Sequence, residues 1–113
     1  MTIPIARLDP RKRGLARWLP TLEAQVMRQL WAAEGPLTAQ DVLSALNASR
    51  PTPYAYTTIM TTLSRLHKRG LLSRASAAMR KGIGYRYTPV CTLREYERAQ
   101  TRYALTALEE SHQ

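Results

Sequence analysis

Apolar residues recur every three or four positions in several separate segments of the chain, which predicts amphipathic helices. The first helix is expected to begin with Thr21 as its N-cap, and Gly35 and Pro36 end its pattern. A short second helix is expected after Thr38, whose spacing to Asp41 is typical of a capping box. Their apolar sides hold Leu22, Val26, Met27, Leu30 and Trp31 in the first helix and Val42, Leu43 and Leu46 in the second.

The segment "AYTTIMTTLSRLHKRG", residues 55–70, predicts a third helix with two different faces. At 100° per residue, Ile59, Leu63 and Leu66 lie together and form the core side. The opposite side is a strip of hydroxyl groups leading into long cations, and Gly70 follows in the position of a C-terminal cap. Threonine is a poor helix former, so we expect this strip to serve a contact. It contains Thr57, Thr61, Arg65 and Lys68, with Thr58 and Ser64 at its margins.

Two short strands are expected next, in "LLSRA" (71–75) and "GYRYTP" (84–89). The small and basic residues of "SAAMRKGI" (76–83) predict an exposed hairpin loop between them. In the second strand Arg86 alternates with two tyrosines, so it is expected to point away from the packed face. A two-stranded hairpin therefore follows the third helix.

A last helix is expected from the capping box of Thr92 and Glu95 to about Glu110. Its apolar positions follow an approximately helical stripe. We assign this stripe to dimerisation; it comprises Leu93, Tyr96, Ala99, Tyr103 and Ala107.

Three helices followed by a two-stranded hairpin is the order of a winged helix-turn-helix. The predicted fold class is therefore mainly α with a small β-hairpin wing, extended by a C-terminal dimerisation helix. Residues 1–20, with three prolines among basic residues, are expected to form a flexible basic arm. The DNA-binding domain is expected over residues 21–90 and the dimerisation helix over residues 91–113.

The charge of the chain indicates a polyanionic partner. The 113 residues carry a formal net charge of +9, and no acidic residue occurs between Asp41 and Glu95. An acid there would repel a phosphate backbone, whereas each base releases counterions on binding. A solvated basic face without a partner would also account for the charge.

In a winged helix-turn-helix the third helix lies in the DNA major groove and the wing contacts the adjacent backbone. Threonine lets the helix approach base edges, since its hydroxyl forms hydrogen bonds and its methyl packs on thymine. Arg65 suits either a bidentate guanine contact or a phosphate. The expected DNA contacts are Tyr56, Thr57, Thr58, Thr61, Thr62, Arg65 and Lys68 in the third helix, Arg80, Lys81 and Arg86 in the wing, and Arg11, Lys12 and Arg13 in the arm.

The sequence contains no catalytic set and no glycine-rich phosphate loop, so neither an enzyme nor a cofactor is expected. Cys91, His67 and His112 are too few for a Cys/His zinc site, and no metal is expected. Cys91 would be a redox sensor if Arg94 or the following helix lowered its pKa, but packing is the favoured interpretation. No apolar run suggests a membrane span or a signal peptide, so a cytoplasmic location is expected.

Three motifs together resemble the penicillinase repressor family, the BlaI/MecI type, over about residues 19–97. They are the "VM..LW" of Val26, Met27, Leu30 and Trp31, the "AYTT...TTL.RL" helix with Arg69 where a lysine is usual, and the "Y.Y.P" wing ending at Pro89. The resemblance implies a dimeric winged-helix repressor of a palindromic operator that overlaps a promoter. It implies that Thr57, Thr58, Thr61 and Arg65 read the operator and that Arg86 belongs to the wing.

Family members usually dimerise through about three C-terminal helices, of which this sequence contains the first. We therefore expect that the dimer interface is reduced to one helix per subunit, includes the basic arm, or is weak. Some members leave DNA after a membrane-bound sensor leads to cleavage near the junction of the two domains. Little of this chain lies beyond that junction, so the sequence does not decide whether an upstream sensor or protease regulates the protein.

Two further classes of function are compatible with the sequence. One is nonspecific binding of nucleic acid, either architectural or to RNA through stacking on Tyr54, Tyr56, Tyr85 and Tyr87. The second is a winged helix that contacts protein, for which the charge is incidental. Packing beside a small core is the favoured interpretation of the tyrosines.

Overall fold

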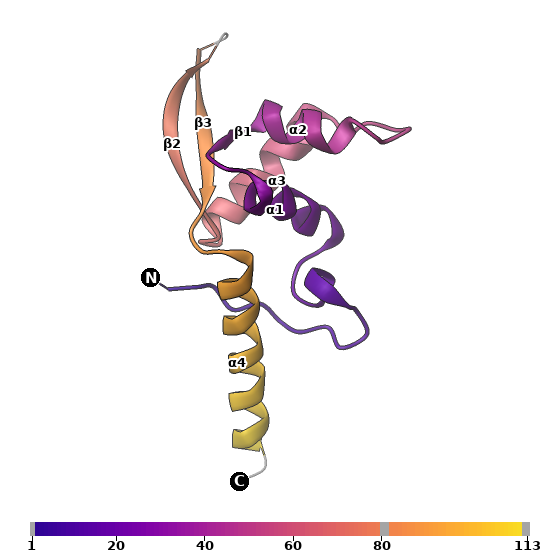
Figure 1. Ribbon diagram of the computed structural model, residues 1–113, viewed down its shortest axis with the longest axis vertical. Coiled ribbons are helices and arrows are strands. Elements are labelled where there is room, and N and C mark those ends of the chain that lie inside the picture. Colours follow the sequence, from indigo (N-terminus) through magenta and orange to yellow (C-terminus); the bar gives the residue numbers. More distant parts are fainter. Residues whose placement is uncertain (1, 80–81, 112–113) are drawn as a thin grey trace.

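A computed structural model describes residues 2–79 and 82–111 (Figure 1). The elements are the 3₁₀-helix η1 (Gly14–Arg17), α1 (Thr21–Ala32), β1 (Leu37–Thr38), α2 (Ala39–Asn47), α3 (Tyr56–Lys68), β2 (Leu72–Met79), β3 (Gly82–Pro89) and α4 (Leu93–Ser111). Helices α1, α2 and α3 pack together, the β2–β3 hairpin rises beside them, and α4 projects from the opposite end (Figure 1). The molecule is elongated, with extents of 57 × 33 × 22 Å. The predicted winged helix-turn-helix is confirmed.

Capping explains most of the helix boundaries. The capping box of α2 is confirmed, because Asp41 N donates to Thr38 Oγ1 at 3.1 Å and Thr38 N donates to Asp41 Oδ2 at 2.9 Å. At the end of α3, Gly70 has φ +87°, and Leu71 N donates to the carbonyl of Leu66 at 3.0 Å. The prediction for Thr21 is wrong, because the N-cap of α1 is the preceding residue, a proline without a side-chain cap.

The sheet is larger than the predicted hairpin. Its strand order is β1-β3-β2, and β1 pairs Leu37 with Tyr87 on β3. The strands β2 and β3 pair from Leu72–Pro89 out to Met79–Gly82, so most of the predicted loop 76–83 is strand. Backbone pairing continues beyond the core there, although alanine and serine carry little strand signal. Arg80 and Lys81, predicted to contact DNA, lie outside the described residues.

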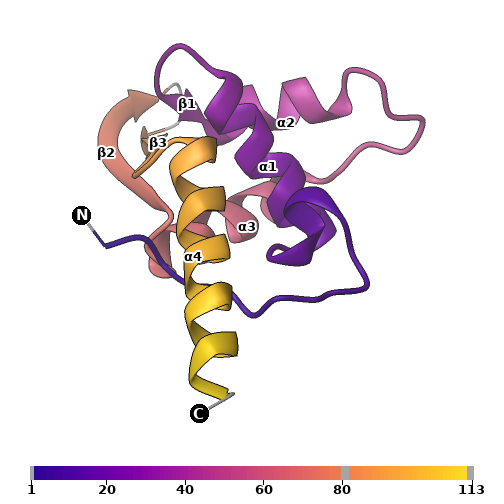
Figure 2. The same cartoon turned by 60° about the horizontal axis from the view of Figure 1, so that its bottom comes forward.

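The N-terminal segment is packed, which corrects the expectation of a flexible arm over residues 1–20. Leu15, Trp18 and Leu19 are 3%, 6% and 1% exposed and belong to the core. Nearer the terminus, Ala6 N donates to Gln100 Oε1 on α4 at 2.9 Å, and Gln100 Nε2 donates to the carbonyl of Pro4 at 2.8 Å. Figure 2 shows the segment crossing beside α4. Burial of these apolar side chains and the two hydrogen bonds of Gln100 offset the conformational entropy that the segment loses when it becomes ordered.

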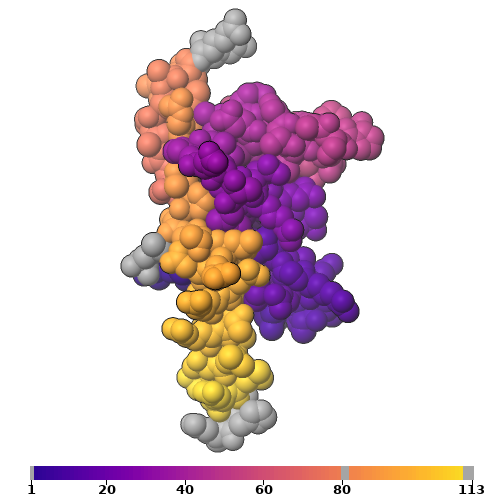
Figure 3. Space-filling model, viewed as in Figure 1, coloured from indigo at the N-terminus to yellow at the C-terminus, as the bar shows by residue number. Residues whose placement is uncertain are grey.

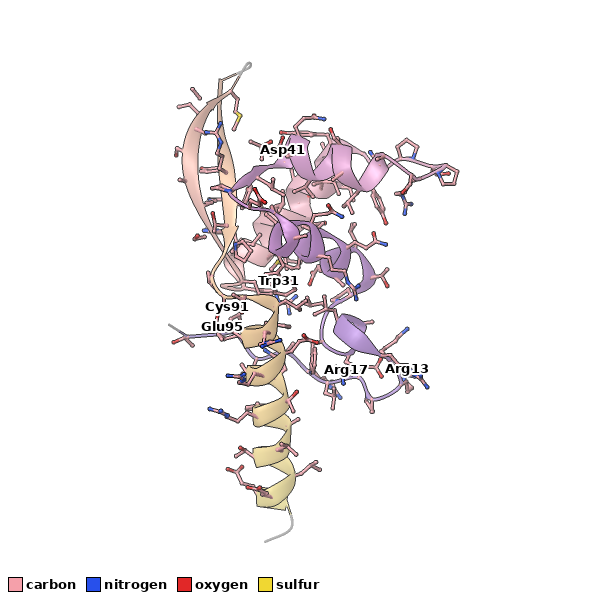
Figure 4. The ribbon with its side chains drawn as sticks, viewed as in Figure 1. Arg13, Arg17, Trp31, Asp41, Cys91 and Glu95 are labelled. Carbon is pink, nitrogen blue, oxygen red and sulfur yellow. The ribbon has the colours of Figure 1, made fainter. Side chains whose placement is uncertain are left out.

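The start of α4 is joined to α1. The predicted capping box is confirmed, since Glu95 N donates to Thr92 Oγ1 at 3.1 Å and Thr92 N donates to Glu95 Oε1 at 2.9 Å. Trp31 Nε1 donates to the carbonyl of Cys91 at 2.9 Å, and the labelled side chains show this junction in Figure 4.

Burial raises the pKa of the Cys91 thiol, and the Glu95 carboxylate adds to the effect. A lowered pKa, which a redox sensor needs, is therefore not found.

Tyr96 on α4 is fully buried, at an edge-to-face angle of 85° to Trp18, and its hydroxyl has no hydrogen-bond partner among the described residues. Burial raises the pKa of this hydroxyl to about 12. Between pH 10 and 12 the unfolded chain therefore loses a proton that the folded chain keeps, and stability falls as pH rises.

We expect wild type to lose about 1 kcal/mol more than Tyr96→Phe between pH 8 and pH 11. Urea unfolding of both proteins at the two pH values measures the difference. Equal losses would show that the tyrosine has an ordinary pKa in the folded state.

Candidate nucleic-acid interface

The outward side of α3 presents the predicted threonines and cations to solvent. Thr57, Thr58 and Thr61 are exposed, and so are Arg65 and Lys68. The inward side holds Ile59, Leu63 and Leu66, each 0% exposed. The first turn of α3 contains no acidic residue, and its N-cap has no side-chain bond. The backbone N–H groups of the first turn therefore suit an anion, and the cations offer a second anion-binding position at the other end of the helix.

Thr62 is wrongly assigned to this face. It is 4% exposed, and its hydroxyl donates to the carbonyl of Thr58 at 2.8 Å. On the helical wheel it lies next to Ile59 and Leu66 on the core side, so it does not reach DNA.

The turn between α2 and α3 fixes where α3 begins. Asn47 clamps the backbone of Tyr54, because its Nδ2 donates to the Tyr54 carbonyl at 3.1 Å and its Oδ1 accepts from Tyr54 N at 2.8 Å. The Tyr54 hydroxyl donates to Gln25 Oε1 on α1 at 2.9 Å. These bonds hold the start of α3 against the other two helices. Tyr54 is therefore occupied within the fold and is a poor stacking platform for RNA.

A polar groove runs between the C-terminal half of α3 and β2. It brings Arg74 beside the predicted cations, although no sequence pattern distinguishes this arginine from its basic neighbours. The Arg74 guanidinium also lies 4.0 Å from the ring centre of Tyr85 on β3. This groove suits a phosphate; its lining residues are Thr61, Ser64, Arg65, His67, Lys68 and Arg74.

A second, apolar groove lies between the N-terminal half of α3 and the hairpin. Its exposed side chains include Tyr56, Met60 and Ile83, at 45%, 43% and 82% exposure. Tyr85, at 38% exposure, lies beside them, whereas Tyr87 is buried at 4%. Sequence reasoning misses Met60 because an apolar residue beside a core stripe is ordinarily assigned to the core. An exposed apolar patch of this kind marks a contact surface, and bases and deoxyribose offer apolar groups to fill it.

The remaining predicted contacts are spread along the molecule. Arg86 on β3 is exposed, as predicted. The cluster of Arg11, Lys12 and Arg13 is exposed, but it lies below α1 and far from the hairpin. Figure 4 labels Arg13 of this cluster. Arg11 donates to both oxygens of Asp9, at 3.2 and 3.4 Å, and this lowers the pKa of the Asp9 carboxyl. The structure does not bring this cluster together with α3.

The predicted dimerisation stripe divides into two parts. Tyr96 packs within the subunit against two tryptophans, so its assignment to an interface is wrong. Leu93 and Ala99 are half-buried. Tyr103 is 57% exposed, and Ala107 is exposed as well, on the part of α4 that projects past the body in Figure 3.

Within residues 2–79 and 82–111, no group of three or more His, Cys, Asp or Glu side chains is placed to hold a metal ion. None of the helices in this part of the chain is both long and apolar enough to cross a membrane.

Residues 19–113 match the sequence profile of a family described as "Penicillinase repressor". Two curated relatives, both named "Transcriptional regulator BlaI", come from Mycobacterium tuberculosis strains CDC 1551 / Oshkosh and ATCC 25618 / H37Rv. Each is 42% identical to the chain over 72 residues, which cover 64% of this chain and 48% of the relative. The match therefore spans about half the length of these relatives.

Proposed function

Because the chain belongs to the penicillinase repressor family, we propose that it represses transcription by binding DNA sequence-specifically, as a homodimer on a palindromic operator. The two symmetry-related α3 helices enter successive major grooves, and the bound dimer blocks a promoter sterically. Thr57, Thr58 and Thr61 lie near base edges, while Lys68, Arg74 and Arg86 contact phosphates.

One observation carries this proposal: among the described residues, the exposed side of α3 and both of its flanking grooves are lined without any acidic side chain. Acidic residues are also absent from the sequence between Asp41 and Glu95, which covers α3 and the whole hairpin. A surface this consistently free of carboxylates favours a polyanion over a neutral or basic protein partner. The relatives' name, transcriptional regulator, supports the same function, and regulators of this kind are not enzymes.

Selection from a random duplex library, followed by affinity measurements from about 50 to 200 mM salt, tests the proposal. We expect the selected duplex to bind about a thousandfold or more tightly than its scrambled version. Selection should also return an inverted repeat, because a two-fold symmetric dimer reads two half-sites. Equal affinity for the two duplexes would contradict sequence-specific repression and indicate nonspecific binding. Tighter binding of single-stranded RNA would indicate an RNA-binding protein, and no binding of nucleic acid would indicate a protein partner.

The proposed dimer interface is the outer part of α4. Tyr103 is 57% exposed there, and Ile5 and Leu8 of the N-terminal segment are 44% and 42% exposed. Ile5, Leu8 and Tyr103 line one groove, so the two segments form a continuous apolar surface. Large exposed apolar surfaces mark association sites.

Tyr103→Asp is expected to weaken the dimer at least about tenfold, because it places a carboxylate in the desolvated part of the interface. Sedimentation velocity over a concentration series measures the dissociation constant. Thr101→Asp adds the same charge at an exposed position of α4 outside this groove, and it should leave the mass of the dimer unchanged. An unchanged dimer in Tyr103→Asp would exclude this part of α4 from the interface.

A further inference from the structure

Glu23 places a buried carboxylate directly behind the proposed DNA-binding helix. It lies in the first turn of α1 and is 4% exposed. Among the described residues it is the only buried acidic side chain. A buried carboxylate is costly unless cations or hydrogen-bond donors compensate it.

Both compensating cations come from the last two turns of α3 and its C-cap. Arg69 Nη1 donates to Glu23 Oε2 at 2.5 Å, and its side chain is 37% exposed. Arg65 Nη1 lies 3.8 Å from the other carboxylate oxygen, Oε1, and the Arg65 side chain is 59% exposed. Each oxygen of Glu23 therefore faces a different arginine. The closer pair is anchored within the fold, whereas the longer one leaves Arg65 able to exchange between Glu23 and another anion.

Arg65 is also the cation with two candidate roles, binding a phosphate and reading a base. It borders the polar groove that suits a phosphate, together with Lys68 and Arg74. A guanidinium without a carboxylate partner in that position would bind any duplex, because phosphate contacts carry no sequence information. A phosphate would only replace one anionic partner of Arg65 with another, so a guanidinium already beside a carboxylate gains little from it. Guanine offers two acceptors in the major groove, to which Arg65 donates through its remaining N–H groups while Nη1 stays near Glu23.

We propose that Glu23 is a positioning residue that sets the sequence specificity of the helix by holding Arg65. Its carboxylate neutralises part of the positive charge on the α1 side of α3 and so suppresses binding to phosphates alone. Only a site that places guanine against Arg65 adds a bidentate contact while Nη1 stays beside Glu23. This inference rests on the proposed function and adds a determinant of specificity that makes no contact with DNA.

Glu23→Gln in the full chain tests the inference, with the selected duplex and its scrambled version as probes over the same range of salt. We expect the scrambled duplex to bind about 3- to 10-fold more tightly and the selected duplex to change less, so that the specificity ratio falls. The slope of log K against log salt for the scrambled duplex should steepen by about one, because one more cation displaces counterions. A purely structural ion pair would leave this slope unchanged.

Glu34→Gln is the matched control, because it removes the same charge from an exposed position just after α1. It should shift both duplexes equally and by much less. Glu23→Asp keeps the charge, but its side chain is one methylene shorter. It should therefore keep the ion pair with Arg69 and lose the longer contact with Arg65. Circular dichroism melting checks that each variant folds. If Glu23→Gln does not fold, Glu23→Asp decides, with a steeper slope expected.

Slopes and specificity ratios equal to those of wild type in the folded variants would overturn the inference. That result would leave the proposed function intact, provided that wild type still prefers its selected duplex. Wild type that shows no preference would instead overturn the proposed function and the inference together.

Discussion

Leu63→Ala is expected to lower the free energy of unfolding by about 3 kcal/mol, a large share of the roughly 5–15 kcal/mol typical of a domain. Leu63 is 0% exposed on the core side of α3 and belongs to the central hydrophobic cluster. Truncating it removes apolar contacts and leaves a cavity between helices that cannot fully close. Urea denaturation at pH 7 measures the change in midpoint and slope.

Met60→Ala on the same helix is the control, because Met60 is 43% exposed and lies outside the core cluster. It should cost less than about 1 kcal/mol. Similar losses in the two variants would mean that the core side of α3 is wrongly identified. The outward direction of the threonines would then be wrong as well.

Arg65→Ala is expected to weaken binding to the selected duplex by about 1–3 kcal/mol, up to roughly a hundredfold, and to relax specificity at one base pair. The scrambled duplex should lose much less, because Glu23 already compensates part of the Arg65 charge at 3.8 Å. Titration of both duplexes at one salt concentration measures the two losses.

Lys68→Ala is the comparison that separates the two roles of a cation. Lys68 is exposed and lines the same groove, and its ammonium group lacks the planar fork that lets arginine bind guanine through two bonds. Its loss should weaken both duplexes about equally and reduce the salt slope by about one. If Arg65→Ala behaves in the same way, Arg65 binds phosphate and the guanine contact is excluded.

The helices are predictable because their signals are local. Apolar spacing places the core sides of α1 and α3, and the capping boxes at Thr38 and Thr92 lie within four residues of their partners. Glycine after α3 likewise marks its end. Each of these features is written into one short stretch of sequence.

The features that sequence reasoning misses depend on contacts between distant parts of the chain. Strand β1 has two residues and exists only because Leu37 and Thr38 meet β3. The packing of Trp18 against Tyr96 likewise joins the two ends of the sequence. Composition alone favours a flexible arm, since prolines and cations dominate it and its few apolar residues show no period.

The sequence predicts which face of α3 forms the candidate site, but it does not predict every side chain on that face. The helical wheel identifies Thr57, Thr61 and Arg65, but Thr62 lies near the boundary of the strip and belongs to the buried side. Glu23 cannot be found from sequence, because its closest partner, Arg69, is 46 residues away. A carboxylate in the first turn of a helix is an ordinary dipole partner, and nothing local distinguishes this one.

The two hydrogen bonds of Gln100 have a consequence for synthesis on the ribosome. One bond spans 94 positions of the sequence and the other spans 96 positions. The segment around Pro4 and Ala6 therefore cannot take its place until α4 has been made. At about 5–20 residues per second, that delay is on the order of 5–20 s. Throughout this interval the nascent chain displays the segment around Pro4 and Ala6 without its partner on α4. Translation speed therefore determines how long this segment is open to proteases before Gln100 holds it.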